Sequence, residues 1–166
     1  MLKGPIRKTV LCLLGLTVPT FALMTSLAGF VGTDQPAQPL RSQIVRQDET
    51  KITKGDWGVM YRYFAGESLA TRNVLVAVAI VEQGKAVHRA HRHAQEEYLM
   101  LIEGSGAWSL DGKEIPAKTG DVLYAAPWVY HGLTNTGIPP LKFAVVRYNS
   151  KGVEQMSRPD DRPDEL

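Results

Sequence analysis

Short apolar runs separated by glycine and proline turns make up most of residues 58–148. Residues 73–81 are apolar at nearly every position, which is typical of a central strand or of a strand covered on both faces. Residues 97–102 alternate instead, so that Glu97 shares one face with two leucines while larger side chains take the other face. Both patterns predict β-strands.

Turn residues divide the rest of this region into further strands. Asp111-Gly112 is a two-residue hairpin signal because both residues tolerate positive φ angles, and Gly120-Asp121 begins another strand that Pro127 ends. No segment here shows a sustained helical period. The pattern predicts an all-β domain, a closed or sandwich-like antiparallel barrel, with strands at residues 58–64, 73–81, 97–102, 107–110, 113–115, 122–126 and 141–148.

The polar segments on either side of these runs predict the boundaries of the domain. The chain has 166 residues, of which 44% are hydrophobic, and this fits one compact domain at residues 58–148. Residues 29–57 are polar and contain prolines, and we interpret them as a linker or N-terminal arm. Residues 149–166 are polar and interrupted by prolines, so we expect a C-terminal tail that is disordered or packed loosely on the outside.

The N-terminus has the features of an export signal. Basic residues precede an uncharged apolar run that continues from Thr9 to beyond Phe30. Small residues at the two positions that a signal peptidase reads predict cleavage after Ala28, which makes residues 1–28 a signal peptide. Because the run approaches the ~20 residues of a membrane span, an uncleaved anchor is the alternative. We therefore expect a chain that is periplasmic or secreted, or else anchored to the membrane and facing outside the cytoplasm.

Charge and cysteine content narrow the classes of function. The formal net charge is +2, from 19 basic and 17 acidic residues that are spread along the chain without a basic run. Nucleic acid is therefore excluded as an expected partner. The single cysteine, Cys12, lies in the apolar N-terminal stretch and can form no intrachain disulfide. Any metal ligands of the folded domain must be histidines or carboxylates.

Three histidines and a glutamate carry the candidate chemistry. His91 and His93 are two residues apart, so on an extended segment both imidazoles point to the same face. Glu97 lies beyond a short polar break and can fold back towards them, whereas His131 has to come from elsewhere in the barrel. This set suits one divalent transition ion, Fe, Mn, Zn, Ni or Cu, and leaves coordination positions open for water or substrate.

The same residues carry a resemblance to a known family. The run that contains His91-Arg92-His93, Glu97 and Gly104 resembles the first motif of the cupin superfamily, and residues 120–135 resemble the second motif, which contains His131. The resemblance implies a double-stranded β-helix, or jelly-roll barrel, that holds a metal ion through His91, His93, Glu97 and His131.

Two residues depart from the cupin pattern. Gly84 is one residue further from His91 than in the usual first motif, which we interpret as a difference in loop length. Trp128 takes the place where the second motif has a glycine next to the proline. A large ring at this turn, close to His131, is expected to reshape the mouth of the barrel.

Other side chains are weaker candidates for the site. We expect His88 to be a solvated loop residue, the alternative being an additional ligand or a proton carrier. Arg62, Arg72 and Arg147 are expected to be solvated, the alternative being an inward guanidinium that clamps an anionic substrate. Tyr130 lies close to His131 and is a weak candidate for a general base. Arg62 and Arg147 are the other weak catalytic candidates.

These inferences predict an exported metal-dependent enzyme that acts on a small oxygen-bearing molecule. Dioxygenase chemistry is favoured, and a lyase, decarboxylase or isomerase is compatible with the same donors. The alternative function is a non-catalytic module that binds a small molecule such as a sugar or a phenolic compound. A homodimer is expected because an open-edged barrel is stabilised when a second copy covers its exposed strands.

Overall fold

The computed structural model describes residue 4 and residues 39–166. The predicted signal peptide at residues 1–28 and the first part of the arm lie outside this range. Among the described residues, no helix combines the length and the apolar character that a membrane crossing requires. Their elements are the 3-10 helix η1 (Gln47–Glu49) and strands β1 (Lys51–Gly55), β2 (Gly58–Gly66), β3 (Thr71–Val81), β4 (Glu96–Glu103), β5 (Ser105–Leu110), β6 (Lys113–Lys118), β7 (Val122–Ala125), β8 (His131–Thr134) and β9 (Leu141–Ser150).

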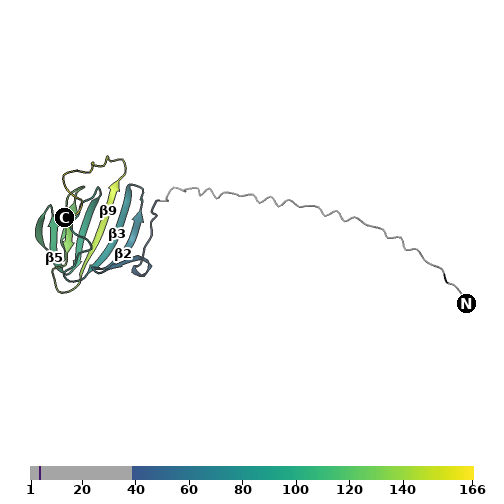
Figure 1. Ribbon diagram of the computed structural model, residues 1–166, viewed down its shortest axis with the longest axis horizontal. Coiled ribbons are helices and arrows are strands. Elements are labelled where there is room, and N and C mark those ends of the chain that lie inside the picture. Colours follow the sequence, from purple (N-terminus) through teal and green to yellow (C-terminus); the bar gives the residue numbers. More distant parts are fainter. Residues whose placement is uncertain (1–3, 5–38) are drawn as a thin grey trace. The chain divides into compact units, whose positions relative to one another are not determined.

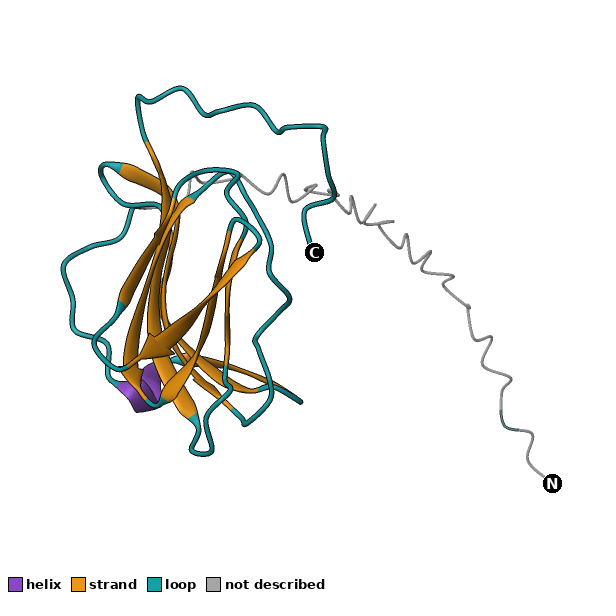
Figure 2. Ribbon diagram, turned by 90° about the vertical axis from the view of Figure 1, so that its left-hand side faces the viewer, coloured by secondary structure: helices purple, strands orange, loops and turns teal. Residues whose placement is uncertain are grey.

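These strands form two sheets. One sheet has six strands in the order β1-β2-β3-β9-β4-β7, and the other has three in the order β6-β5-β8. All of the pairs are antiparallel. The sheets face each other as two layers (Figures 1 and 2), and β9 lies between β3 and β4, which precede it by many residues. The all-β prediction is confirmed, and the arrangement is a double-stranded β-helix.

The alternation along β4 sets one wall of the barrel. Glu97, Leu99 and Leu101 are buried, with at most 4% of each residue exposed, whereas Tyr98 and Met100 are 40% and 50% exposed. The predicted inward and outward faces of residues 97–102 are therefore correct. The buried apolar residues of both sheets form one core, which consists of Ala77, Ala79, Val81, Leu99, Leu101, Trp108, Ala117, Leu123, Ala125, Leu133, Leu141, Phe143 and Val145.

The barrel begins earlier than residue 58, where the apolar pattern placed its start. Strand β1 lies within the expected arm and pairs with β2 over its whole length, from Lys51 opposite Arg62 to Gly55 opposite Gly58. Every residue of β1 is exposed. The segment contributes no side chain to the core, and backbone pairing to β2 alone makes it a strand. Its sequence therefore has no apolar periodicity that could predict it.

The C-terminal tail was expected to be disordered or packed loosely on the outside. Residues 149 and 150 complete β9, and the chain then runs across one end of the barrel to the side of the second sheet (Figures 1 and 2). There the amide of Leu166 donates to the carbonyl of Ala90 at 2.9 Å. The tail is mostly exposed on the outside of the barrel, but hydrogen bonds hold its last residues in place. Its order comes from hydrogen bonds to residues 90–92 and Tyr130, which polar composition does not reveal.

Two glycines of β2 permit a direct test of the sheet packing. Gly58 has φ 132° and lies so close to β3 that an added Cβ would be 2.1 Å from the carbonyl oxygen of Ile80. Gly66 has a similar φ of 129° with open space around it. We expect Gly58→Ala to lower the free energy of unfolding by about 1–3 kcal/mol more than Gly66→Ala, because only Gly58 adds a clash to the shared backbone strain. Urea denaturation of both variants measures this difference, and equal losses would contradict it.

Candidate metal centre

The two halves of the histidine cluster are joined by backbone pairing. His93 and His91 lie in the segment before β4, and His131 is the first residue of β8. The amide of His91 donates to the carbonyl of His131 at 3.0 Å, and the amide of His131 donates back to His91 at 2.9 Å. This bridge explains how a histidine forty residues further along the chain reaches the pair that the spacing had predicted.

The three imidazoles converge on one point. One nitrogen from each of His91, His93 and His131 lies within 4.8 Å of the other two. The centroids of the three rings are 4.7 to 5.1 Å apart. The cluster is therefore compact enough for the three residues to hold one metal ion.

Backbone carbonyls orient two of the rings. Nδ1 of His93 lies 3.1 Å from the carbonyl oxygen of Gln95, and Nδ1 of His131 lies 2.8 Å from that of Val129. When Nδ1 of a neutral ring donates to a carbonyl, Nε2 carries the lone pair that a metal ion binds. Metal-binding histidines are commonly held in this way. Nε2 of His131 is buried and has no hydrogen-bond partner among the described residues, as expected for a nitrogen that coordinates a metal ion.

Glu97 lies against the same nitrogens. Its carboxylate oxygens are 3.2 Å from Nε2 of His93 and 3.5 Å from Nε2 of His131. Donors that bind a common ion at about 2.0–2.2 Å are roughly 2.9–3.5 Å apart for angles between 90° and the tetrahedral value. Glu97 therefore has the position of a fourth donor. Arg147 is further away, with Nε 3.9 Å from the carboxylate.

The protonation states match those of metal ligands. Burial by itself would raise the pKa of Glu97, but its close polar contacts with His131 and His93 outweigh burial and hold the pKa well below its ordinary value. Burial first, and then repulsion from His88 and the other two histidines, lowers the pKa of His91 to about 3. Near neutral pH the carboxylate is thus ionised and the His91 ring is neutral, which are the forms that bind metals. The donors of this chain fit a divalent transition ion.

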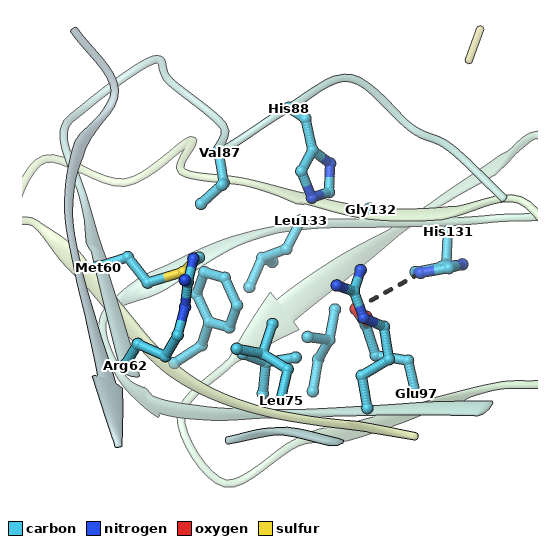
Figure 3. A pocket seen from close by; sticks show the side chains of 13 residues that line it. Met60, Arg62, Leu75, Val87, His88, Glu97, His131, Gly132 and Leu133 are labelled. Carbon is cyan, nitrogen blue, oxygen red and sulfur yellow. Dashed lines mark ion pairs between the residues drawn. The ribbon is translucent and has the colours of Figure 1, made fainter. Parts of the chain in front are cut away.

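A cavity of ≈ 210 Å³ opens from this cluster into the barrel (Figure 3). Glu97 and His131 form one end of it, and apolar side chains of both sheets form most of its walls. The volume lies below the roughly 300–1,000 Å³ of sites for drug-sized molecules, which indicates a small ligand. The lining residues are Met60, Arg62, Leu75, Val87, His88, Glu97, Leu99, His131, Gly132, Leu133, Phe143, Val145 and Arg147.

Two of the three candidate arginines point into the barrel. Arg62 and Arg147 line the cavity, contrary to the expectation that both are solvated, whereas Arg72 is exposed as expected. The alternation of the strands explains this result. Arg147 is two residues beyond Val145, which faces the core, and Arg62 lies opposite the buried Ala77. The period of two in residues 141–148 was a signal that could have identified Arg147.

The remaining candidate residues differ in their contact with the cavity. His88 is exposed but lines the cavity, and its ring centroid is 3.9 Å from that of His91. Tyr130 is 1% exposed, does not line the cavity, and donates its hydroxyl hydrogen bond to the carbonyl of Pro163. Trp128 has φ 65°, a conformation that favours glycine, and its indole donates to the carbonyl of Met156 at 2.8 Å. Both rings thus contact the tail.

Arg92 holds the C-terminal tail against the segment that contains His91 and His93, a role that no sequence pattern indicated. The residue lies between the two histidines and is 3% exposed. Its guanidinium donates to Asp161 at 2.8 Å and to the carbonyls of Pro159 and Arg162. Its amide donates to the carbonyl of Asp164 at 2.9 Å. No periodic pattern marks such a residue, because its partners are mostly backbone carbonyls of an irregular segment.

Comparison with known proteins gives a family and a fold. Residues 77–147 match the family described as the cupin domain. The chain is 33% identical over 109 residues to an uncharacterised protein of Methanocaldococcus jannaschii, and this match spans 59% of the present chain and 87% of that protein. It is 29% identical to a gentisate 1,2-dioxygenase of a Streptomyces species over 47% of this chain and 22% of that enzyme.

Two proteins of Thermotoga maritima are also similar. The chain is 35% identical to an oxalate-binding protein over 34% of this chain and 47% of that protein. The crystal structure of a predicted oxalate decarboxylase superposes with a TM-score of 0.57 at 23% identity, and the match covers 64% of this chain and 99% of that structure. At this level of identity the structural likeness supports the fold alone.

Proposed function

The chain belongs to the cupin superfamily, and from this premise we propose that it is a metal-dependent enzyme that acts on a small oxygen-bearing molecule. Cupins and other barrels of this architecture support many activities, so the proposal depends on the site. The observation that carries it is the convergence of three imidazoles and the Glu97 carboxylate at one end of a small apolar cavity.

His91, His93, Glu97 and His131 would be the ligands of one ion, which we expect to be Fe, Mn, Zn, Ni or Cu. When bound, such an ion supplies polarisation of a substrate oxygen or, if it is redox-active, activation of dioxygen. The protein's own contribution is to orient the imidazoles of His93 and His131 by backbone contacts to Nδ1 and to supply one buried negative charge. Apolar walls such as Leu99, Phe143 and Val145 limit the access of water to the bound molecule.

We favour dioxygenase-type chemistry over the alternatives. Glu97 and His131 lie at one end of the cavity, so a small molecule bound in the cavity would lie next to the proposed metal site. The similarity to a gentisate 1,2-dioxygenase supports this choice. Lyase, decarboxylase and isomerase reactions need a group that moves a proton. Among the described lining residues, His88, Glu97 and His131 are the side chains whose chemistry allows them to carry a proton, and the last two are proposed ligands.

A non-catalytic binding module is the second candidate function. It is supported by the similarity to an oxalate-binding protein and by the lack of an assigned general base in the cavity. In this case the metal ion would only help to hold a small molecule. A sugar has little apolar surface, so these walls favour a phenolic ligand or a similar flat molecule over a sugar.

Elemental analysis combined with oxygen uptake separates the two functions. We expect protein isolated from its native compartment to contain about one transition ion per chain. An enzyme of the dioxygenase type consumes dioxygen when a substrate from a panel of phenolic and other small organic acids is added, and removal of the ion stops the uptake. A metal ion that only strengthens ligand binding, with no turnover of any compound in the panel, would favour the binding module. Protein without metal would contradict the enzyme proposal.

We also propose that the chain is exported and forms a homodimer. The basic and apolar N-terminal residues support export, and the mass of the mature protein would show whether cleavage follows Ala28. The outer face of β4 and β7 supports dimerisation, because Tyr98, Met100, Val122 and Tyr124 are 40% to 59% exposed on paired strands. A molecular mass of one chain in light scattering at micromolar concentration would contradict the homodimer.

A further inference from the structure

The cavity has a positive charge at the end that lies opposite the metal-binding residues. Figure 3 shows Arg62 beside Met60 at one end, with Glu97 and His131 at the other. Nε of Arg62 is buried and has no hydrogen-bond partner in the described part of the chain. Within that part no carboxylate forms an ion pair with this guanidinium, whereas Arg147 lies 3.9 Å from Glu97.

The strand register shows that Arg62 occupies a position of the core. Arg62 is opposite Ala77, Ala77 is opposite Val145, and Val145 is opposite Leu99, so the four residues form one row across the sheet. The other three members of the row are buried and apolar. A cation in such a row is unfavourable unless an anion or hydrogen-bond acceptor reaches it. A ligand whose anionic group accepts from the Arg62 guanidinium would offset the cost of placing this charge in the row.

The same register gives the length that such a ligand has to span. Strands β2 and β4 are separated by β3 and β9, and three spacings of ~4.8 Å place their backbones roughly 14 Å apart along the sheet. The long side chain of Arg62 and the Glu97 side chain close part of this gap. The walls between the two ends are apolar and include Leu75, Phe143 and Val145. A ligand that contacts both ends thus has two polar groups and an apolar body between them.

We propose that the site binds a small monocarboxylic acid with an apolar, preferably aromatic, body. Its carboxylate pairs with Arg62, and its oxygen donors lie at the end formed by the histidines and Glu97. The planar fork of a guanidinium matches the two oxygens of a carboxylate, and the pair excludes a neutral analogue that cannot accept both hydrogen bonds. This inference deepens the proposed function and rests on it, because the oxygen donors require the metal ion.

Binding to the zinc form of the whole chain tests the inference without any turnover, since zinc is redox-inert. The probes are 3,4-dihydroxybenzoate and its one-carbon-longer homologue 3,4-dihydroxyphenylacetate, each compared with its neutral amide by titration calorimetry. A hydrogen bond to a charged group contributes to the binding free energy, and the neutral amide lacks the charge. We therefore expect at least one acid to bind about 10- to 100-fold more tightly than its amide. The two acids differ in length by one carbon, so they test two distances between the ends of the cavity.

Variants assign this preference to Arg62. We expect Arg62→Met to reduce the affinity for the acid about 10- to 100-fold while the affinity for the amide stays the same. Arg62→Lys keeps the charge without the fork and should lie between the two. Arg72→Met is the matched control, because Arg72 is exposed on β3, and it should bind like the wild type.

The outcomes separate the failure of this inference from that of the proposed function. If zinc binds in the expected ratio but both acids bind no better than their amides, the carboxylate assignment is wrong and the metal centre stands. An acid preference that survives in Arg62→Met also overturns the assignment to Arg62. If zinc does not bind, the proposed function itself fails. The comparison of acid and amide on the wild-type chain needs no substitution, so it decides the question even if a variant does not fold.

Discussion

His93→Ala is expected to abolish the retention of the metal ion through purification. The substitution removes one of three imidazoles that lie within 4.8 Å of one another, and it leaves Glu97 without its nearest nitrogen partner at 3.2 Å. Loss of a residue that only orients a ligand already costs ~10–100-fold in metal affinity, so loss of a ligand should cost more. Elemental analysis and the rise in melting temperature on addition of zinc measure the effect, because a ligand that binds only the folded state stabilises it.

His88→Ala is the matched control for this variant. His88 belongs to the same histidine-rich stretch and contacts His91, but it is exposed and its Nδ1 lies 3.1 Å from a backbone carbonyl. We expect it to retain the metal ion. Unchanged metal content in His93→Ala would show that the assigned site is wrong. Equal losses in the two variants would show that His88 is also a ligand.

Deletion of residues 159–166 is expected to lower the melting temperature by roughly 5–10 °C and to weaken metal binding. The deletion removes the acceptors of the buried Arg92 side chain, the Pro163 carbonyl that accepts from Tyr130, and the amide that donates to Ala90. For a domain of this size such a shift corresponds to the loss of a small number of buried hydrogen bonds. Ala90 and Arg92 flank His91, and the deletion removes the tail residues that hydrogen-bond to them. The His91 side chain should then be held less firmly, so metal affinity should fall.

A double-mutant cycle assigns this effect to Arg92. Arg92→Met replaces the guanidinium by an apolar side chain of similar length, so the deletion should lower the melting temperature much less in this background than in the wild type. This non-additivity is expected of groups in direct contact. Deletion of residues 159–166 with no effect on stability would indicate that the contacts of the tail contribute nothing. Additive effects would place its contribution outside Arg92.

The parts of the site that lie close together in the chain were predictable. The spacing of His91, His93 and Glu97 needs only an extended backbone and a short break, and these are local properties. The alternation in β4 likewise predicted which of its side chains face the core, because one face of each strand must be buried. His131 was predicted as a partner on its residue type and motif, although its contact with His91 depends on a backbone bridge.

Features that depend on backbone pairing or on single buried contacts were not predictable. Strand β1 has no inward side chain, so nothing in its composition distinguishes it from a linker. The tail is polar, and its order depends on the carbonyl groups that every residue carries. Arg62 and Arg147 were both expected in solvent because arginine is seldom buried. The alternation of residues 141–148 was a signal for Arg147, but only the register opposite Ala77 shows that Arg62 lines the cavity.

The amino-acid sequence by itself thus determined the all-β class, the residue types of the candidate metal site and the inward face of β4, because periodicity and spacing act over a few residues. Only the tertiary structure decided that Arg62 stands at the far end of the cavity and that the tail is fastened behind the histidines by Arg92. The physical reason is that the cost of a buried charge, and the hydrogen bonds that offset it, depend on residues that are distant along the chain.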